Sequence, residues 1–174
     1  SSVVATSRRS VLALLAAGLA MVQARGMGIN FLLSVVLLVW MADIAAYFAG
    51  RALGQRFIKV KLAPSISPGK SWEGALGGAV GVMLMAVLWV QCDAQLQPDS
   101  LSLFSHLAQG GWALLVLATL FLTAMSVLGD LVESLIKRSA GVKDSSQLLP
   151  GHGGVLDRID ALVPTLPLAM MLVS

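Results

Sequence analysis

The residues best suited to chemistry are acidic side chains in two short segments near the C-terminal end of the sequence. Asp130 and Glu133 are three residues apart in the first segment, and Asp157 and Asp160 repeat that spacing in the second. A spacing of three places two side chains on one face of a helix. In the absence of cysteine ligands, carboxylate oxygens favour Mg²⁺ over zinc, and Mg²⁺ commonly binds one or two carboxylates together with substrate phosphates. The pattern predicts a site for magnesium and a phosphate-bearing substrate.

Basic residues flank both acidic segments and offer partners for the remaining charge of a polyphosphate. Lys137, Arg138 and Lys143 follow the first segment, and Arg158 lies within the second. Ammonium and guanidinium groups form charge-assisted hydrogen bonds with phosphate oxygens. The alternative is a solvated amphipathic loop held by surface ion pairs. This alternative does not explain why so many carboxylates lie between two apolar stretches.

A glycine-rich turn, Pro150–Gly154, separates the two acidic segments. Glycines let the backbone approach a ligand closely. His152 in this turn has no obvious second metal ligand of its own type, and Cys92 is the one cysteine of the chain. Structural and catalytic zinc sites need several such ligands. We therefore interpret His152 as a turn or substrate-contact residue.

Asp43 lies near the end of a long apolar run, where a charge costs about 2.5–3.5 kcal/mol or more in the centre of a bilayer. Asp43, Tyr47 and Gly50 have helical spacing and would share one face. Ionisable groups inside membrane segments usually serve function. The alternative is a carboxylate that reaches the headgroups or pairs with Arg51.

The segment Ser67–Ser71 reads Ser-Pro-Gly-Lys-Ser and predicts a turn that leads into a helix. Amides at a helix start bind phosphate, and Lys70 and Ser71 add hydrogen-bond donors. A P-loop is a poor match because Pro64 occupies the position of its first glycine. The alternative is an ordinary capped connector with a basic residue at the membrane interface.

The composition predicts that membrane helices position these groups. Of the 174 residues, 57% are hydrophobic and 12% are charged, and the mean hydropathy is +0.84. Soluble domains carry about a quarter charged residues, so a soluble enzyme is not expected, and a disordered chain is excluded. One cysteine excludes a disulfide framework within the chain. We predict an all-α, polytopic transmembrane bundle that forms a single domain over residues 1–174.

About five apolar stretches are expected to span or enter the membrane, although the first and last are short against the ~20 residues that a span requires. They are Val11–Ala24, Ile29–Ala49, Ala75–Gln91, Trp112–Leu128 and Ile159–Val173. Glycines at the start of the third stretch predict close helix packing, which depends on small residues in lipid. These are Gly74, Gly77, Gly78 and Gly81.

The loop charges predict an orientation. The segments Arg51–Ser71 and Asp130–Asp160 are rich in Lys and Arg, whereas Gln91–Gly111 has neither. Positive loops mark the cytoplasmic side. Five alternating spans put both basic segments on that side, and Arg25 breaks the pattern. We expect an integral membrane protein with its active face toward the cytoplasm.

The stretch Ser134–Asp160 resembles the signature of the CDP-diacylglycerol synthase family, also called phosphatidate cytidylyltransferases. The segments Lys61–Pro64, Ser67–Gly74 and Asp43–Tyr47 also match that family's pattern. The resemblance runs from about Leu38 to the C-terminus. Bacterial members carry several more N-terminal membrane helices, so we expect an N-terminally incomplete cytidylyltransferase domain.

The resemblance implies transfer of a cytidylyl group from CTP to phosphatidate, which gives CDP-diacylglycerol and pyrophosphate. It implies Mg²⁺, a monovalent cation such as K⁺ in some members, and membrane lipids as surroundings; a homodimer is a further expectation, and no nucleic acid is expected. Asp130 and Asp157 are the implied metal ligands, with Glu133, Asp144 and Asp160 as weaker candidates. The expected catalytic set is Asp130, Asp157, Lys137, Arg138 and Lys143. The implied contacts to nucleotide or lipid phosphate are Asp43, Lys70, Ser71, Lys137, Arg138, Lys143, Asp144, His152 and Arg158.

Two other functions are open on the sequence alone. A CTP-dependent polyprenol or phytol kinase would transfer the terminal phosphate to a lipid alcohol, although the long signature argues against it. An ion-coupled transporter would use the intramembrane carboxylates as a relay, but the sequence shows no inverted symmetry between its halves. A purely structural membrane subunit leaves the clustered carboxylates unexplained.

Overall fold

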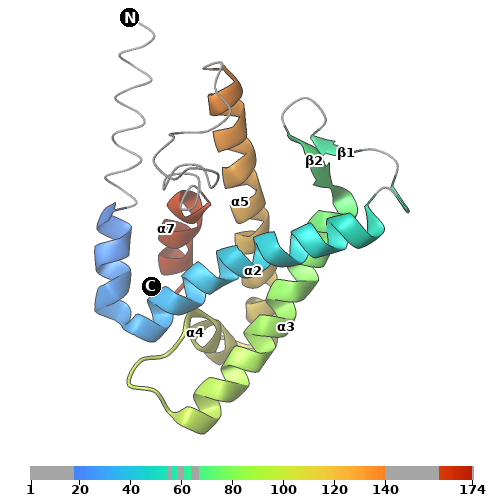
Figure 1. Ribbon diagram of the computed structural model, residues 1–174. Coiled ribbons are helices and arrows are strands. Elements are labelled where there is room, and N and C mark those ends of the chain that lie inside the picture. The colour runs from blue at the N-terminus through green and yellow to red at the C-terminus, as the bar shows by residue number, and fades with distance from the viewer. Residues whose placement is uncertain (1–17, 55, 59–60, 64–66, 140–160, 174) are drawn as a thin grey trace, which may run out of the picture.

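The computed structural model describes residues 18–54, 56–58, 61–63, 67–139 and 161–173, and they form a helical bundle with one small hairpin (Figure 1). Residues 18–27 are helical. The remaining elements are α2 (Ile29–Leu53), β1 (Lys61–Ala63), β2 (Ser67–Ser71), α3 (Trp72–Leu96), α4 (Leu103–Gln109), α5 (Trp112–Ser139) and α7 (Leu162–Val173). The predicted all-α membrane class is confirmed, apart from the hairpin.

Within the described residues, three helices are long and apolar enough to cross a membrane: α2, α3 and, within α5, the segment Trp112–Ile136. The prediction of about five spans is not confirmed. The helix α7 has 12 residues, which is fewer than the ~20 that a span requires. The first predicted stretch, Val11–Ala24, is described only from Gly18 onward, where it is helical.

Small residues hold α2 and α3 in close contact, as the glycine pattern predicted. A Cβ atom added at Gly78 would lie 2.9 Å from the carbonyl oxygen of Ala42, and one at Gly77 would lie 2.1 Å from the Cβ atom of Ala49. Backbones that approach this closely leave no room for larger side chains. The contact fixes the end of α2 against the start of α3, beside the hairpin (Figure 1).

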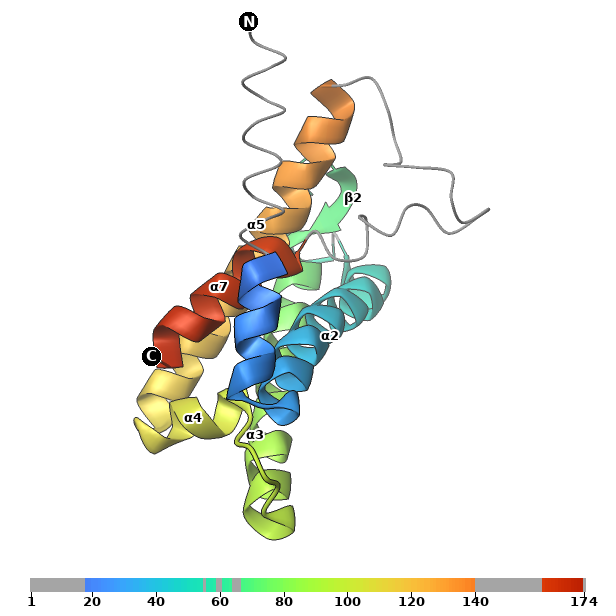
Figure 2. The same ribbon diagram turned by 90° about the vertical axis from the view of Figure 1, so that its left-hand side faces the viewer.

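The helix α7 packs against α5 and also contacts α2 and α4 (Figure 2). Gly129 in α5 faces this partner closely, because a Cβ atom there would lie 2.8 Å from Cγ of Pro164. Fully buried apolar side chains fill the space between the helices. The largest of them are Phe31, Phe104, Leu38, Leu103, Leu107, Leu115, Leu122 and Leu166.

The hairpin was not predicted, because Ser67–Ser71 was interpreted as a turn. It instead forms β2, which pairs antiparallel with β1 in a register that sets Lys61 opposite Ser71 and Ala63 opposite Ser67. The tertiary pairing overrides the weak strand preference of Pro, Gly and Ser. The strand delivers Lys70 immediately before α3 begins.

A buried carboxylate organises the end of the bundle away from the hairpin. Asp93 is 8% exposed. Its Oδ2 atom accepts hydrogen bonds from the hydroxyls of Ser102 and Ser105, both at 2.5 Å, and its Oδ1 atom accepts one from the Asn30 amide at 2.9 Å. A buried charge needs such partners. Asp93 thereby ties α2 and α3 to the first turn of α4.

We expect Asp93→Asn to destabilise the protein by about 1–2 kcal/mol, because an amide group accepts at one atom where the carboxylate accepts at two. Thermal unfolding in lipid nanodiscs measures the effect. The matched control is Asp99→Asn, since Asp99 is exposed in the connector that follows α3. Equal unfolding temperatures for the two variants would show that Asp93 does not stabilise this end of the bundle.

Candidate active site

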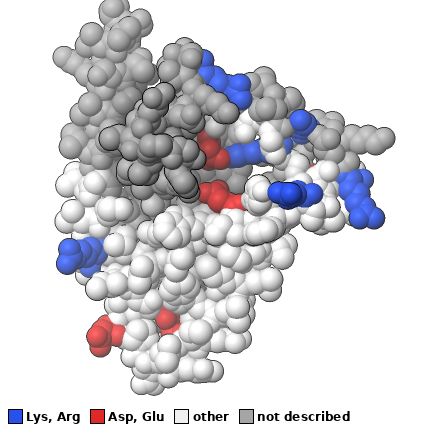
Figure 3. Space-filling model, viewed as in Figure 1, with Lys and Arg blue, Asp and Glu red and all other residues white. Residues whose placement is uncertain are grey.

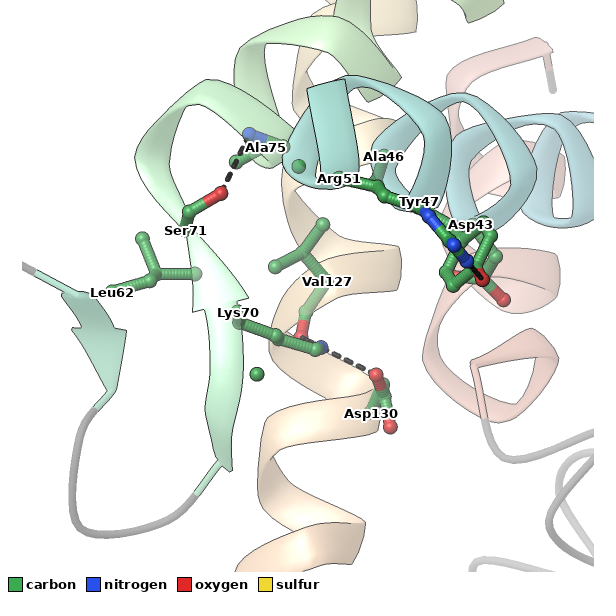
Figure 4. A pocket seen from close by; sticks show the side chains of 13 residues that line it. Asp43, Ala46, Tyr47, Arg51, Leu62, Lys70, Ser71, Ala75, Val127 and Asp130 are labelled. Carbon is green, nitrogen blue, oxygen red and sulfur yellow. Dashed lines mark hydrogen bonds and ion pairs between the residues drawn. The ribbon is translucent and has the colours of Figure 1, made fainter. Parts of the chain in front are cut away.

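A pocket of about 590 Å³ opens where the hairpin meets the ends of α2 and α3 and the middle of α5 (Figure 4). This volume lies within the range of small-molecule sites. It is lined by Asp43, Ala46, Tyr47, Gly50, Arg51, Leu62, Gly69, Lys70, Ser71, Gly74, Ala75, Val127 and Asp130. Three segments that the sequence analysis treated separately therefore meet in one cavity.

An ion pair between Lys70 and Asp130 crosses the pocket from the hairpin to α5 (Figure 4). The ammonium group also lies 3.4 Å from the carbonyl oxygen of Val127, to which it donates. The side chains of Lys70 and Asp130 remain 25% and 32% exposed. Both groups are therefore held in place and are still accessible to a ligand.

Asp130 and Glu133 lie on one helix, as their spacing of three predicted, although the fourth apolar stretch ends at Leu128. The helix α5 continues without a break to Ser139. Charged residues mark the end of the apolar stretch but do not end the helix. Asp130 therefore projects from a rigid element that also contacts α7 through Gly129.

Asp43 supplies a second carboxylate from α2, on the same face as Tyr47 and Gly50 as predicted. It lies close enough to Asp130 and Lys70 to interact electrostatically with both. Arg51 donates a hydrogen bond of 2.9 Å to the hydroxyl of Tyr47. The hydrogen-bond partner of Arg51 is therefore this phenol, and not Asp43 as the alternative interpretation expected. Two carboxylates beside one ammonium group favour the addition of a cation.

Ser71 ends β2 and caps α3. Its hydroxyl oxygen accepts a hydrogen bond of 3.1 Å from the backbone amide of Gly74, as the capped-connector interpretation expects. The hydroxyl proton remains able to donate into the pocket. A Cβ atom at Gly74 would lie 3.0 Å from the Ala46 carbonyl oxygen, so glycine keeps the helix start close to α2.

Several predicted site residues lie outside the described part of the chain. These are Lys143, Asp144, His152, Asp157, Arg158 and Asp160. Lys137 is in α5, where its side chain is not described, and Arg138 is exposed near the end of that helix. Glu133 is also in α5 but does not line the pocket.

The metal prediction is therefore untested. Among the described residues, no three His, Cys, Asp or Glu side chains are grouped closely enough to hold a metal ion. Asp130 is in place at the pocket, but the other main predicted ligand, Asp157, lies outside those residues.

The sequence analysis missed the contributions of Val127 and Leu62 to the pocket. Val127 takes part through its backbone carbonyl, which no side-chain pattern could have indicated. Leu62 is in β1 and reaches the pocket because of the hairpin. In the sequence, only the position of Leu62 within the short segment Lys61–Pro64 could have indicated that it belongs to the site.

Basic side chains gather around the pocket end of the molecule. Figure 3 shows a hollow in which acidic and basic groups lie side by side, with further basic groups around it and acidic groups at the opposite end. Of the basic residues, Arg51 and Lys70 line the pocket itself. Fold and site together define a helical integral membrane protein with a charged, ligand-sized pocket at its basic end.

The chain belongs to the cytidylyltransferase family, whose model matches residues 3–174, which confirms the resemblance. It is 49% identical to the phosphatidate cytidylyltransferase of Haemophilus influenzae, over 80% of this chain and 44% of that protein. It is 46% identical to that of Pseudomonas aeruginosa, over 79% and 45%. It is 41% identical to that of Staphylococcus epidermidis, over 86% and 51%. The chain thus spans about half the length of these relatives.

Proposed function

We propose that the protein to which this chain belongs transfers the cytidylyl group of CTP to phosphatidate, which gives CDP-diacylglycerol and pyrophosphate. The observation that carries the proposal is the pocket in which Asp43, Lys70 and Asp130 meet, in a chain of the cytidylyltransferase family. The relatives' name describes the same reaction. No observation favours the kinase or the transporter.

The reaction joins two anions, and the pocket residues fit that problem. A phosphatidate oxygen attacks the α phosphorus of CTP, a new P–O bond forms, and the bond to the β phosphate breaks. The attacking oxygen is ionised at neutral pH, so no protein nucleophile is needed. Positioning and charge stabilisation then dominate catalysis. Lys70 and the Ser71 hydroxyl are the donors that would orient the phosphates.

We propose that Mg²⁺ assists this chemistry. The donor set fits the ion, because Asp43 and Asp130 offer hard oxygen atoms in a pocket with one lysine. Asp130 would hold the ion together with Asp157. Asp160 and Glu133, which does not line the pocket, stay weaker predictions. When bound, Mg²⁺ withdraws negative charge from the triphosphate and stabilises the leaving pyrophosphate. A monovalent cation such as K⁺ stays a prediction.

The location of the pocket suits a lipid and a nucleotide together. The pocket lies at the basic end of α2, α3 and α5, where the spans meet the connecting segments. We propose that this end faces the cytoplasm at a bacterial inner membrane, in accord with the positive-inside rule. CTP would then arrive from water while the phosphatidate chains stay in the bilayer. The homodimer also stays a prediction.

The products test the proposed function. We expect the complete protein, given phosphatidate and CTP labelled at the α phosphate, to place the label in a lipid. CTP labelled at the γ phosphate should instead release it as pyrophosphate. The kinase alternative, given a polyprenol in place of phosphatidate, predicts the reverse, with the γ label in the lipid. The proposal would be rejected if γ-labelled CTP gave a labelled lipid and α-labelled CTP did not.

Removal of divalent ions should lower lipid labelling by about 100-fold, because a Lewis-acid metal contributes several kcal/mol to such a transition state. Chelation with EDTA followed by Mg²⁺ addition measures loss and recovery. Circular dichroism before and after chelation serves as the folding control. Labelling that persists at the original rate in EDTA would contradict the metal assignment.

A further inference from the structure

Glu73 is a buried carboxylate at the start of α3 that does not line the pocket. It is 7% exposed. Its Oε1 atom accepts two backbone hydrogen bonds, one from the amide of Phe57 at 3.2 Å and one from the amide of Ile58 at 2.8 Å. Both donors belong to the connector between α2 and β1.

These bonds, more than side-chain packing, hold the connector in place. The Phe57 side chain is 74% exposed and that of Ile58 is 38% exposed, so burial of apolar surface contributes little here. Hydrogen bonds to a charged acceptor are about twice as strong as neutral ones. A single carboxylate oxygen therefore anchors the two neighbouring amides.

The anchored connector leads directly into the hairpin. After Ile58, the next described residues form β1 and β2, and Glu73 is the second residue of α3, directly after the hairpin. The Glu73 bonds thus close the base of the loop that contains both strands, next to the pairing of Lys61 with Ser71. Lys70 lies within this closed loop and reaches across the pocket to Asp130.

We propose that Glu73 is a positioning residue that holds the hairpin, and through it Lys70, at the pocket. The hairpin is small, with strands of three and five residues, and a two-stranded hairpin is marginal by itself. Without the hydrogen bonds to Glu73, each substrate that binds must first fix the hairpin and Lys70 in one position. A displacement of about 1 Å in a positioning group can cost up to about 100-fold in rate. The inference for catalysis rests on the proposed function, whereas the inference for the hairpin does not.

The variants Glu73→Ala and Glu73→Gln in the complete protein separate positioning from direct chemistry. The glutamine oxygen can still accept from both amides, but glutamine cannot act as an acid or as a strong metal ligand. We expect Glu73→Ala to lower kcat/KM for CTP by about 10- to 100-fold. Glu73→Gln should stay within about fivefold of the unsubstituted protein, since neutral hydrogen bonds are about half as strong.

Amide hydrogen exchange supplies a readout that needs no activity. In Glu73→Ala, exchange at Phe57 and Ile58 should accelerate by about tenfold, which corresponds to the loss of one such hydrogen bond. The amides of the hairpin strands should accelerate with them. Glu73→Gln should keep both regions protected. The helix α4 is the internal control, because it lies at the other end of the bundle and should be unchanged.

Three results would overturn the proposal: full protection of the hairpin in Glu73→Ala, full activity of Glu73→Ala, or a Glu73→Gln variant as inactive as the alanine. If Glu73→Ala fails to fold, Glu73→Gln decides, because an inactive but protected glutamine variant assigns Glu73 a chemical role. If the unsubstituted protein makes no CDP-diacylglycerol, the proposed function fails. The exchange pattern then still decides whether Glu73 holds the hairpin.

Discussion

Replacement of Asp130 by alanine should lower CDP-diacylglycerol formation by about 100- to 1,000-fold, which is the usual cost of removing one group that stabilises a charged transition state. Asp130 is partly exposed in the pocket and forms the ion pair with Lys70. Its loss removes both a predicted metal ligand and the partner that fixes the ammonium group. The rate of lipid labelling from CTP in the complete protein measures the effect.

The matched control is Asp99→Ala, because Asp99 is exposed and lies in the connector at the other end of the bundle. This variant should retain the activity of the unsubstituted protein. Asp130→Asn keeps the shape of the side chain and should be nearly as impaired as the alanine variant, since the amide lacks the negative charge. Near-normal turnover by Asp130→Ala would remove Asp130 from the site.

Replacement of Gly78 by leucine should destabilise the bundle by about 3 kcal/mol, the upper end of the usual cost of overpacking. Even a Cβ atom at this position would lie 2.9 Å from the Ala42 carbonyl oxygen and 3.4 Å from the Cβ atom of Ala46. These are a backbone atom and a short side chain, so neither can move aside. The unfolding temperature should fall by about 6–12 °C, at about 2–4 °C per kcal/mol.

This substitution should also reduce activity, because α2 carries Asp43 and the start of α3 adjoins Lys70. The matched control is Gly26→Leu, since nothing lies within 4 Å of a Cβ atom added at Gly26. The control should unfold at about the original temperature. If the Gly78→Leu variant unfolded at the same temperature as the Gly26→Leu control, close contact between α2 and α3 would not be needed for stability.

Helical periodicity explains which parts of the site were predictable. Asp43, Tyr47 and Gly50 share a face because helix geometry fixes it, and all three line the pocket. The glycines of α3 predicted close packing for the same reason. Apolar runs also located α2, α3 and α5, since a bilayer requires long apolar helices.

Tertiary contacts explain what the sequence left open. The pairing of β1 with β2 stabilises strands too short and too rich in Pro, Gly and Ser to be expected. The ion pair of Lys70 and Asp130 joins residues 60 positions apart in the sequence, and the spacing within either motif gives no sign of it. Asp93 falls in Gln91–Gly111, a segment between the predicted spans, whereas it lies buried in α3 because Ser102, Ser105 and Asn30 surround it.

The most direct test is a structure of the complete protein with CTP and Mg²⁺ by electron cryomicroscopy in nanodiscs. We predict the triphosphate in the pocket, with phosphate oxygens within hydrogen-bond distance of Lys70 and a metal ion on Asp130. A triphosphate bound away from both residues would show that this pocket is not the CTP site, whatever the activity of the protein.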